Sequence, residues 1–159
     1  MQYLVNATFL INSAKADFSF IENLELSTLQ SILDEVTLQI GLDIEIIIDI
    51  EIVCRRNKKT DISIPKNKLK LLSPVDRKLL EVAFERKKNI LLISDDRQIR
   101  NVSKHNRIRC TNTPQFVAHL VKQSKVDRND ALYFLKKLRS IYIRSKDMDT
   151  VIRRLEKWM

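Results

Sequence analysis

The stretch from residue 73 to residue 96 constrains the fold of this chain more than any other part of the sequence. Ser73-Pro74-Val75-Asp76 has the pattern of a helix start, because it combines a capping serine, a proline in the first turn and an acid three residues after the cap. Asn89–Ser94 then predicts a short buried strand, which Asp95-Asp96 ends. A helix followed by a fully apolar strand is typical of α/β proteins, whose parallel strands are buried on both faces.

The remaining segments continue this alternation of strands and helices. We expect further strands at Tyr3–Ile11, Asp43–Cys54 and Arg107–Cys110. We expect further helices over Ala14–Leu24, over Ser27–Ile40, around Ile99 and Val102, from Thr113-Pro114 onward, over Asp127–Leu138 and over Asp147–Trp158. Ser27 and Gln30 have the spacing of a capping box, and Gly41, the only glycine, has a position that ends many helices. The order predicts one domain over residues 1–159, with a three-layer α/β/α fold, a mainly parallel central sheet and a helical region from about residue 115.

The chain is strongly basic. It has 29 Lys and Arg residues against 20 Asp and Glu residues, a net charge of +9, which favours a polyanionic partner because each neutralised phosphate releases condensed counterions. Ordinary solvated helix faces are the alternative explanation. Aromatic residues make up only 6% of the chain, so we expect recognition through backbone and shape rather than base stacking. We assign RNA binding to cations of the polar segment Arg55–Lys70 and to cations that follow Asp95-Asp96, namely Arg55, Arg56, Lys58, Lys59, Arg97 and Arg100.

The sequence lacks the signals of several other classes of protein. No apolar run reaches the roughly 18 residues that cross a membrane, and the first residues lack the basic head of a secretory signal, so we expect a cytoplasmic protein. A single glycine excludes both glycine-rich phosphate-binding motifs. Cys54 and Cys110 form no CxxC pair, and we expect both to be buried thiols. His105 and His119 are isolated, so no zinc-type spacing exists.

Polar and acidic residues follow the predicted strands at positions that would converge. We expect Asn6 and Thr8 on the first strand, Asp76 in a first helical turn, and Asp95-Asp96 directly after a buried strand. Glu35, on the helix before Gly41, could lean towards the same place. Functional groups of open α/β sheets gather outside the carboxyl ends of the strands. Several oxygen donors there suit Mg²⁺ or Mn²⁺, which can activate water for phosphodiester hydrolysis.

Each of these residues also has a purely structural interpretation. Asp76 satisfies a capping box and needs no further role. Asp95 or Asp96 could cap the helix that follows, and Glu35 could be a solvated helix residue. Singly, each residue favours the structural interpretation. Together with the order of the strands, they favour a metal site.

The same residues carry a resemblance to a known family. The run LLSPVDRKLLEVAFERKKNILLISDDRQIRNVSK closely resembles the second half of PIN domains, in which Leu-Ser-x-x-Asp opens a helix and an apolar strand precedes Thr/Ser-x-Asp. YLVNATFLI resembles the first strand of that family, and SILDEV resembles its glutamate-bearing helix. The resemblance covers most of Met1–Leu120.

The resemblance implies a metal-dependent endoribonuclease, a class that includes toxin ribonucleases and enzymes of RNA maturation and decay. It implies that Glu35, Asp76 and Asp96 are metal-site carboxylates, that Asp95 lies close by, and that Thr8 makes a hydrogen bond within the site. The Ser-x-Asp pattern favours Asp96 over Asp95. An antitoxin or an RNA-processing protein is the partner that such a chain would have.

Asn6 departs from the family pattern, which has aspartate at this position. The amide removes one negative charge and one strong ligand but keeps the shape, so metal affinity and activity should both fall. Two explanations fit. The chain is a degenerate member that binds RNA or a partner without cutting, or it carries an engineered aspartate-to-asparagine change. The intact remaining acids favour the second explanation.

The leading hypothesis is therefore a PIN-type endoribonuclease that is weakened or inactive because of Asn6. A non-catalytic RNA-binding or protein-interaction module on the same fold is the alternative. A response-regulator receiver domain is a third, but its acceptor aspartate would end a middle strand, and the strand before Asp95-Asp96 comes late in the chain. Met148, Val151, Ile152, Leu155 and Trp158 on the last helix would either close the core or form a homodimer interface.

Overall fold

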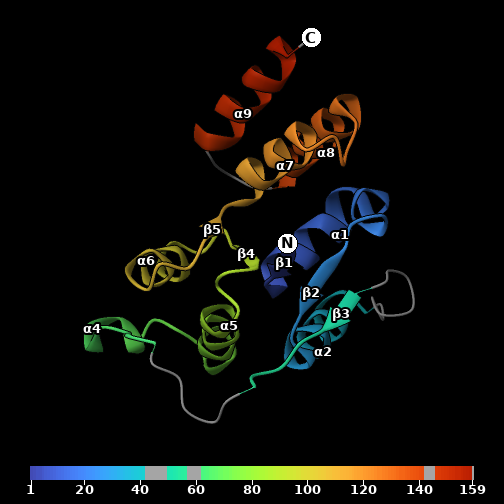
Figure 1. The fold of residues 1–159 in the computed structure, drawn as a ribbon. Helices are drawn as coiled ribbons and strands as arrows, with labels where there is room; N and C mark the ends of the chain where they lie inside the picture. The colour runs from blue at the N-terminus through green and yellow to red at the C-terminus, as the bar shows by residue number, and fades with distance from the viewer. Residues whose placement is uncertain (42–49, 57–61, 142–145, 159) are drawn as a thin grey trace.

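The computed structural model describes residues 1–41, 50–56, 62–141 and 146–158. In these ranges five strands form one parallel sheet in the order β3-β2-β1-β4-β5, with helices on both faces (Figure 1). The predicted three-layer α/β/α fold with a parallel central sheet is confirmed. The strands are β1 (Gln2–Val5), β2 (Leu26–Thr28), β3 (Ile50–Ile52), β4 (Ile90–Ile93) and β5 (Cys110–Thr111).

The order of the strands fixes which helices cover which face. The chain moves outward from β1 to β3 and then returns to the other side of β1 at β4. Right-handed crossovers therefore place the helices of the first half on one face and those between β3 and β5 on the other. The first face carries α1 (Ala7–Glu22) and α2 (Gln30–Ile40), and α1 also packs on α8 (Arg128–Ile141). The second face carries α4 (Lys66–Leu69), α5 (Pro74–Glu85) and α6 (Arg97–His105).

The order in which strands are added reverses at β1, because β2 and β3 lie on one side of it and β4 and β5 on the other. The register of β1 with β4 pairs Val5 with Ile93, so the residues that follow, Asn6 and Ser94, lie at the same edge. Ligands of open α/β sheets bind at such a switch point, outside the carboxyl ends of the strands. We call this place the β1–β4 edge.

The first strand is shorter than predicted. Tyr3–Ile11 is not one strand, because β1 ends at Val5 and α1 begins at Ala7. The reason is Asn6, whose Oδ1 accepts a hydrogen bond from the Phe9 N–H and caps the helix. Thr8 therefore lies in the first turn of α1 and not on a strand. The helix predicted from Ala14 starts seven residues earlier as a result.

The second strand was not predicted. Ser27 does not cap a helix, because Leu26–Thr28 forms β2 between β1 and β3. The helix begins at Gln30, and its N-cap residue Leu29 makes no side-chain capping bond. Buried Thr28 explains the tolerance for polar residues here, since its hydroxyl donates to the Val5 carbonyl oxygen at 2.8 Å. Gly41 ends α2 with a φ of 68°, as its position predicts.

The second half of the chain follows the predictions more closely. Ser73 caps α5 by accepting a hydrogen bond from the Asp76 N–H at 3.1 Å. Helix α7 (Thr113–Lys122) begins at Thr113-Pro114, and α6 contains Ile99 and Val102. The last predicted strand is shifted towards its end, to Cys110–Thr111.

Two further predictions are tested only in part. Strand β3 covers Ile50–Ile52 of the predicted Asp43–Cys54, and residues 42–49 lie outside the described ranges. The segment Arg55–Lys70 contains α4 rather than only loop, while residues 57–61 lie outside those ranges.

The C-terminal helices complete the core. In α9 (Lys146–Lys157), four side chains are buried against α7 and α8, namely Met148, Val151, Ile152 and Leu155. The helix thus closes the core, which is one of the two roles predicted for it, and the homodimer interface stays a prediction. Among the described residues, no helix has the length and apolar character to span a membrane.

Candidate functional site

Asn6 lies at the centre of the β1–β4 edge. Its side chain is buried, with 5% of the residue exposed. The amide nitrogen donates a hydrogen bond to Ser94 Oγ at 3.0 Å, and Oδ1 accepts from the Phe9 N–H at 3.0 Å. Both polar atoms of the amide therefore have protein partners, and Asn6 links the ends of β1 and β4.

Ser94 connects Asn6 to the acidic residues that follow β4. Its Oγ accepts the Asn6 amide and also the Asp96 N–H, at 3.1 Å. Its backbone carbonyl accepts a hydrogen bond from Arg100 Nη1 at 3.2 Å. Since Oγ accepts two hydrogen bonds, its own hydrogen remains to be donated. In the sequence this serine stands out only as part of the Ser-x-Asp pattern, which does not reveal this role.

Asp76 and Asp96 form the acidic part of the site. Asp96 is the N-cap of α6, and its Oδ1 accepts hydrogen bonds from the N–H groups of Gln98 and Ile99, at 2.7 and 3.2 Å. Burial raises the pKa of Asp76, hydrogen bonds from Ser73 lower it, and the nearby Asp96 carboxylate raises it further. The net shift is upward. Two carboxylates from different helices are thus close enough to repel each other.

Asp95 is turned towards a different part of the fold. Its Oδ1 accepts a hydrogen bond from the Thr113 N–H at 2.8 Å, and its Oδ2 accepts one from the Thr113 hydroxyl at 2.6 Å. Thr113 is the first residue of α7. Asp95 therefore fixes the start of α7 against the end of β4, which is a structural role.

Two predicted site residues, Glu35 and Thr8, make no hydrogen bond to the acidic pair in the described part of the chain, and one of them is bonded elsewhere. Glu35 instead pairs with Gln39, one turn later on α2, whose Nε2 donates to Glu35 Oε1 at 3.3 Å. Thr8 is exposed in the first turn of α1. Neither residue is joined by a hydrogen bond to Asp76 or Asp96 among the described side chains.

The predicted RNA-binding cations divide into two groups. Arg97 and Arg100 follow Asp96 on α6, with Arg97 exposed and Arg100 hydrogen-bonded to the end of β4. Arg55 forms an ion pair with Glu81 of α5 at 2.8 Å, and the Arg56 N–H donates to Glu85 at 2.7 Å. Lys58 and Lys59 lie outside the described ranges.

The acidic pair suits a divalent cation held in part by water and substrate. No group of three or more His, Cys, Asp or Glu side chains within the described ranges could hold a metal ion. Asp76 and Asp96 supply hard oxygen ligands, and Oδ2 of Asp96 is not used in capping α6. Mg²⁺ is commonly held by one or two carboxylates together with waters and substrate phosphates. The residues present fit such a weakly bound ion and do not form a complete protein cage.

The two cysteines differ in their surroundings, and the prediction that both are buried is wrong. Cys54 is exposed just after β3, because the chain leaves the sheet there. Cys110 on β5 is partly buried, and burial raises the pKa of its thiol to about 11. Cys110 is therefore a protonated, unreactive thiol at neutral pH.

A scan against protein-family models found no match for this chain, and a search of the curated proteins found none either. The resemblance to PIN domains stays a prediction from the sequence motifs. The geometry of the β1–β4 edge stands on its own as a description of the site.

Proposed function

We propose that this chain is a PIN-type, Mg²⁺- or Mn²⁺-dependent endoribonuclease whose activity is weakened by Asn6. The observation that carries the proposal is the proximity of the Asp76 and Asp96 carboxylates at the switch point of a parallel sheet, where Ser94 links Asp96 to Asn6. Burial is the main cause of the raised pKa of Asp76, and repulsion from Asp96 adds to it; a bound cation would relieve that repulsion.

Each side chain of the edge has a part in this chemistry. Asp76 and Asp96 would hold the cation, and Ser94 would fix the position of Asp96 through its backbone N–H. A bound divalent ion supplies an activated water and a counter-charge for the phosphate group. Arg97, exposed in the first turn of α6, would attract the RNA backbone.

Asn6 explains why activity should be weak. An amide carries no charge, and both of its polar atoms are already hydrogen-bonded to the protein. An aspartate would keep the Phe9 N–H bond and could accept the hydrogen that Ser94 Oγ has left to donate. It would also place a third carboxylate at the edge, which raises the affinity for a divalent cation.

The test compares the chain with Asn6→Asp in the cleavage of a mixed single-stranded RNA pool with Mg²⁺ and with Mn²⁺. We expect cleavage by Asn6→Asp to exceed that of the parent by about 100-fold or more, on the scale of a lost catalytic ligand. The matched control is Asp96→Asn in the Asn6→Asp background, which keeps the α6 cap and should abolish the gain. A second readout is thermal stability, since Mn²⁺ should raise the Tm of Asn6→Asp more than that of the parent.

The alternative is an RNA-binding module that does not cleave, and the fully engaged Asn6 amide favours it. Three results together would establish the alternative and overturn the nuclease. Neither protein would cleave RNA, Mn²⁺ would leave the Tm of both unchanged, and both would still bind RNA in a salt-sensitive way. Binding by phosphate neutralisation should weaken steeply as salt rises.

A further inference from the structure

A cavity of about 590 Å³ opens next to the proposed site, where β3 ends and both α2 and α5 begin. This volume lies in the range of small-molecule and cofactor sites, which is about 300–1,000 Å³. Its position is again at the carboxyl ends of the strands, where ligands of parallel sheets bind. We call it the β3–α5 cavity.

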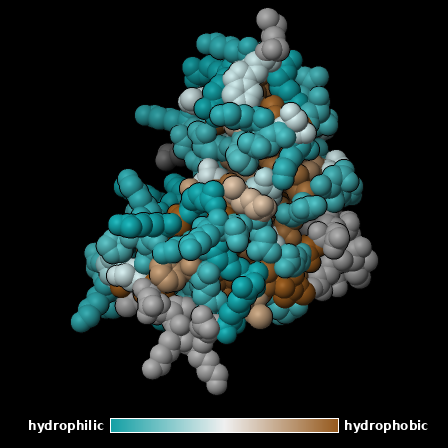
Figure 2. Space-filling model, in the orientation of Figure 1, coloured by the Kyte–Doolittle hydropathy of each residue, from teal (hydrophilic) through white to brown (hydrophobic). Residues whose placement is uncertain are grey.

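One side of the β3–α5 cavity is apolar. Leu29, Val53 and Val82 are buried in the core and present aliphatic surface to the cavity. Ile52 and Pro74 extend this surface outward, and Ile52 remains 46% exposed. The largest brown area on the face shown in Figure 2 lies over the part of the molecule that holds β2 and β3. An aliphatic wall of this kind accepts a flat ring without selecting one base over another.

The other side of the cavity is cationic. Arg77 and Lys78 of α5 line it and take part in no ion pair among the described residues. Arg55 also lines it but is paired with Glu81, the one acid in the lining. The start of α2 adds a partial positive charge there, because Leu29 provides no side-chain cap. The cavity therefore combines an aliphatic wall with unpaired positive charge.

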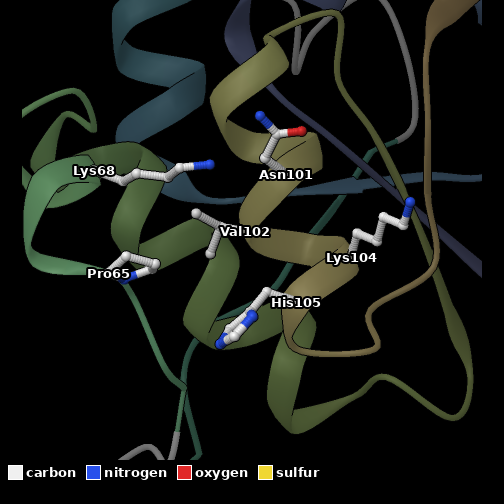
Figure 3. A pocket seen from close by; sticks show the side chains of 6 residues that line it. All are labelled: Pro65, Lys68, Asn101, Val102, Lys104 and His105. Atoms are coloured by element: carbon white, nitrogen blue, oxygen red, sulfur yellow. The ribbon is translucent and has the colours of Figure 1, made fainter.

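A second basic cavity, between α4 and α6, has a smaller apolar surface, formed by Pro65 and Val102, and serves as a comparison (Figure 3). It has a volume of about 510 Å³. Lys68 extends from α4 towards Asn101 of α6, whereas Lys104 points away from α4. Asn106 fixes this segment, since it exchanges hydrogen bonds with the backbone of Ser63 at 2.8 and 2.7 Å. Its lining combines Lys68 and Lys104 with a smaller apolar surface than that of the β3–α5 cavity.

We propose that the β3–α5 cavity binds one nucleotide of a single-stranded RNA, with the base against Leu29, Ile52 and Val53 and the phosphate against Arg77 and Lys78. That the ligand is RNA rests on the proposed function. Arg77 and Asp76 are consecutive residues in the first turn of α5, so their side chains are about 100° apart around one helix. A strand that reaches Asp76 and Asp96 has its neighbouring nucleotide at the cavity.

Cys54 supplies a direct probe of occupancy. It lines the β3–α5 cavity and is exposed, whereas Cys110 is partly buried and protonated at neutral pH. The experiment follows alkylation of Cys54 in the full chain by mass spectrometry, in EDTA, so that no cleavage occurs. The probes are a single-stranded RNA hexamer, an abasic hexamer, uridine monophosphate and inorganic phosphate.

We expect saturating hexamer to slow Cys54 alkylation by about tenfold or more, uridine monophosphate to do so only at much higher concentration, and phosphate to have no effect. The abasic hexamer should protect less than the complete one. Protection by phosphate alone would reduce the cavity to an anion site and overturn the proposal. Equal protection by uridine monophosphate and hexamer would overturn the assignment to an RNA strand.

Substitutions separate the two halves of the cavity. Arg77→Ala and Lys78→Ala should weaken hexamer binding and lower the slope of log K against log salt by about 0.7 for each phosphate group that is no longer neutralised. Ile52→Ser, at an exposed position, should weaken hexamer binding without changing that slope. The matched control is Lys68→Ala with Lys104→Ala in the α4–α6 cavity, which removes the same charge and should leave Cys54 protection at saturation unchanged.

The outcome is independent of catalysis. If the hexamer protects Cys54 but Asn6→Asp does not cleave RNA, the nucleotide site in the cavity is supported and the nuclease is rejected. Cleavage by Asn6→Asp without protection of Cys54, at hexamer concentrations that saturate binding, would support the nuclease and overturn the cavity.

Discussion

At the scale of single residues, Asp76 occupies an unfavourable position for a charge. Burial is the main cause of its raised pKa, and the repulsion from Asp96 adds to it, while hydrogen bonds from Ser73 oppose both. In the folded chain the ionised form is therefore penalised relative to the unfolded chain. This loss of folding stability is absent at pH values below the ordinary carboxyl pKa. It grows as the pH rises from the ordinary pKa to the raised pKa of Asp76, and it is complete above the raised pKa.

We therefore predict that Asp76→Asn stabilises the protein at pH 7 and leaves its stability unchanged near pH 3. The gain should be up to about 1 kcal/mol, the scale of one partly screened charge interaction. Urea denaturation at both pH values measures it. The control is Glu22→Gln, an exposed acid of α1, which should show no comparable gain. A loss of stability at pH 7 would mean that the charge of Asp76 favours the start of α5.

Asn6 and Ser94 show what could be predicted of the site from single residues. Asn6, Asp76 and Asp96 were expected near one another because they follow or precede recognisable elements, and the structure places all three around the β1–β4 edge. The part of Ser94 could not be predicted, because it depends on the register of β1 with β4. The different orientations of Asp95 and Asp96 could not be predicted either, because these two residues are neighbours in sequence but have different hydrogen-bond partners.

At the scale of elements, the sequence predicted those that carry strong local signals. Ser73-Pro74, Thr113-Pro114 and the run Ile90–Ile93 each determine structure with residues that lie next to each other. Strand β2 has only three residues, two of them polar, and its hydrogen bonds all go to segments far away in the chain. Similarly, the β-formers after Asn6 predicted a strand, but the capping bond to Phe9 begins a helix.

The N-terminus of α7 provides a test of the two adjacent aspartates. Asp95→Ala should cost about 2–3 kcal/mol, because the Thr113 N–H and hydroxyl both lose a charged acceptor. Asp96→Asn should cost less than about 0.5 kcal/mol, because asparagine caps a helix as well as aspartate does. Urea denaturation of both variants measures the difference. Equal losses would contradict the assignment of Asp95 to structure and Asp96 to the site.

At the scale of the whole molecule, acids and cations are arranged around one edge of the sheet. The net charge of +9 would attract RNA over a distance. Asp76 and Asp96 would oppose that attraction locally, so under the proposed function a phosphate group would approach them only with a cation between them. Arg77, Lys78 and Arg97 lie on the two helices that carry these acids and offset their charge. The proposed function therefore predicts that metal binding and RNA binding at this edge strengthen each other.

The last helix shows how far the core extends. Leu155 is fully buried and, with Val151, packs α9 against α7 and α8. We predict that Leu155→Ala costs about 2–4 kcal/mol through the cavity it leaves, which in a chain of this length lowers the Tm by roughly 5–15 °C. The control is Arg153→Ala on the exposed face of the same helix, which should stay within about 0.5 kcal/mol of the parent. Calorimetry measures both, and size-exclusion chromatography should give the same oligomeric state for the parent and both variants. A small effect of Leu155→Ala on the Tm, accompanied by a change of oligomeric state, would instead make α9 an interface between two copies of the chain.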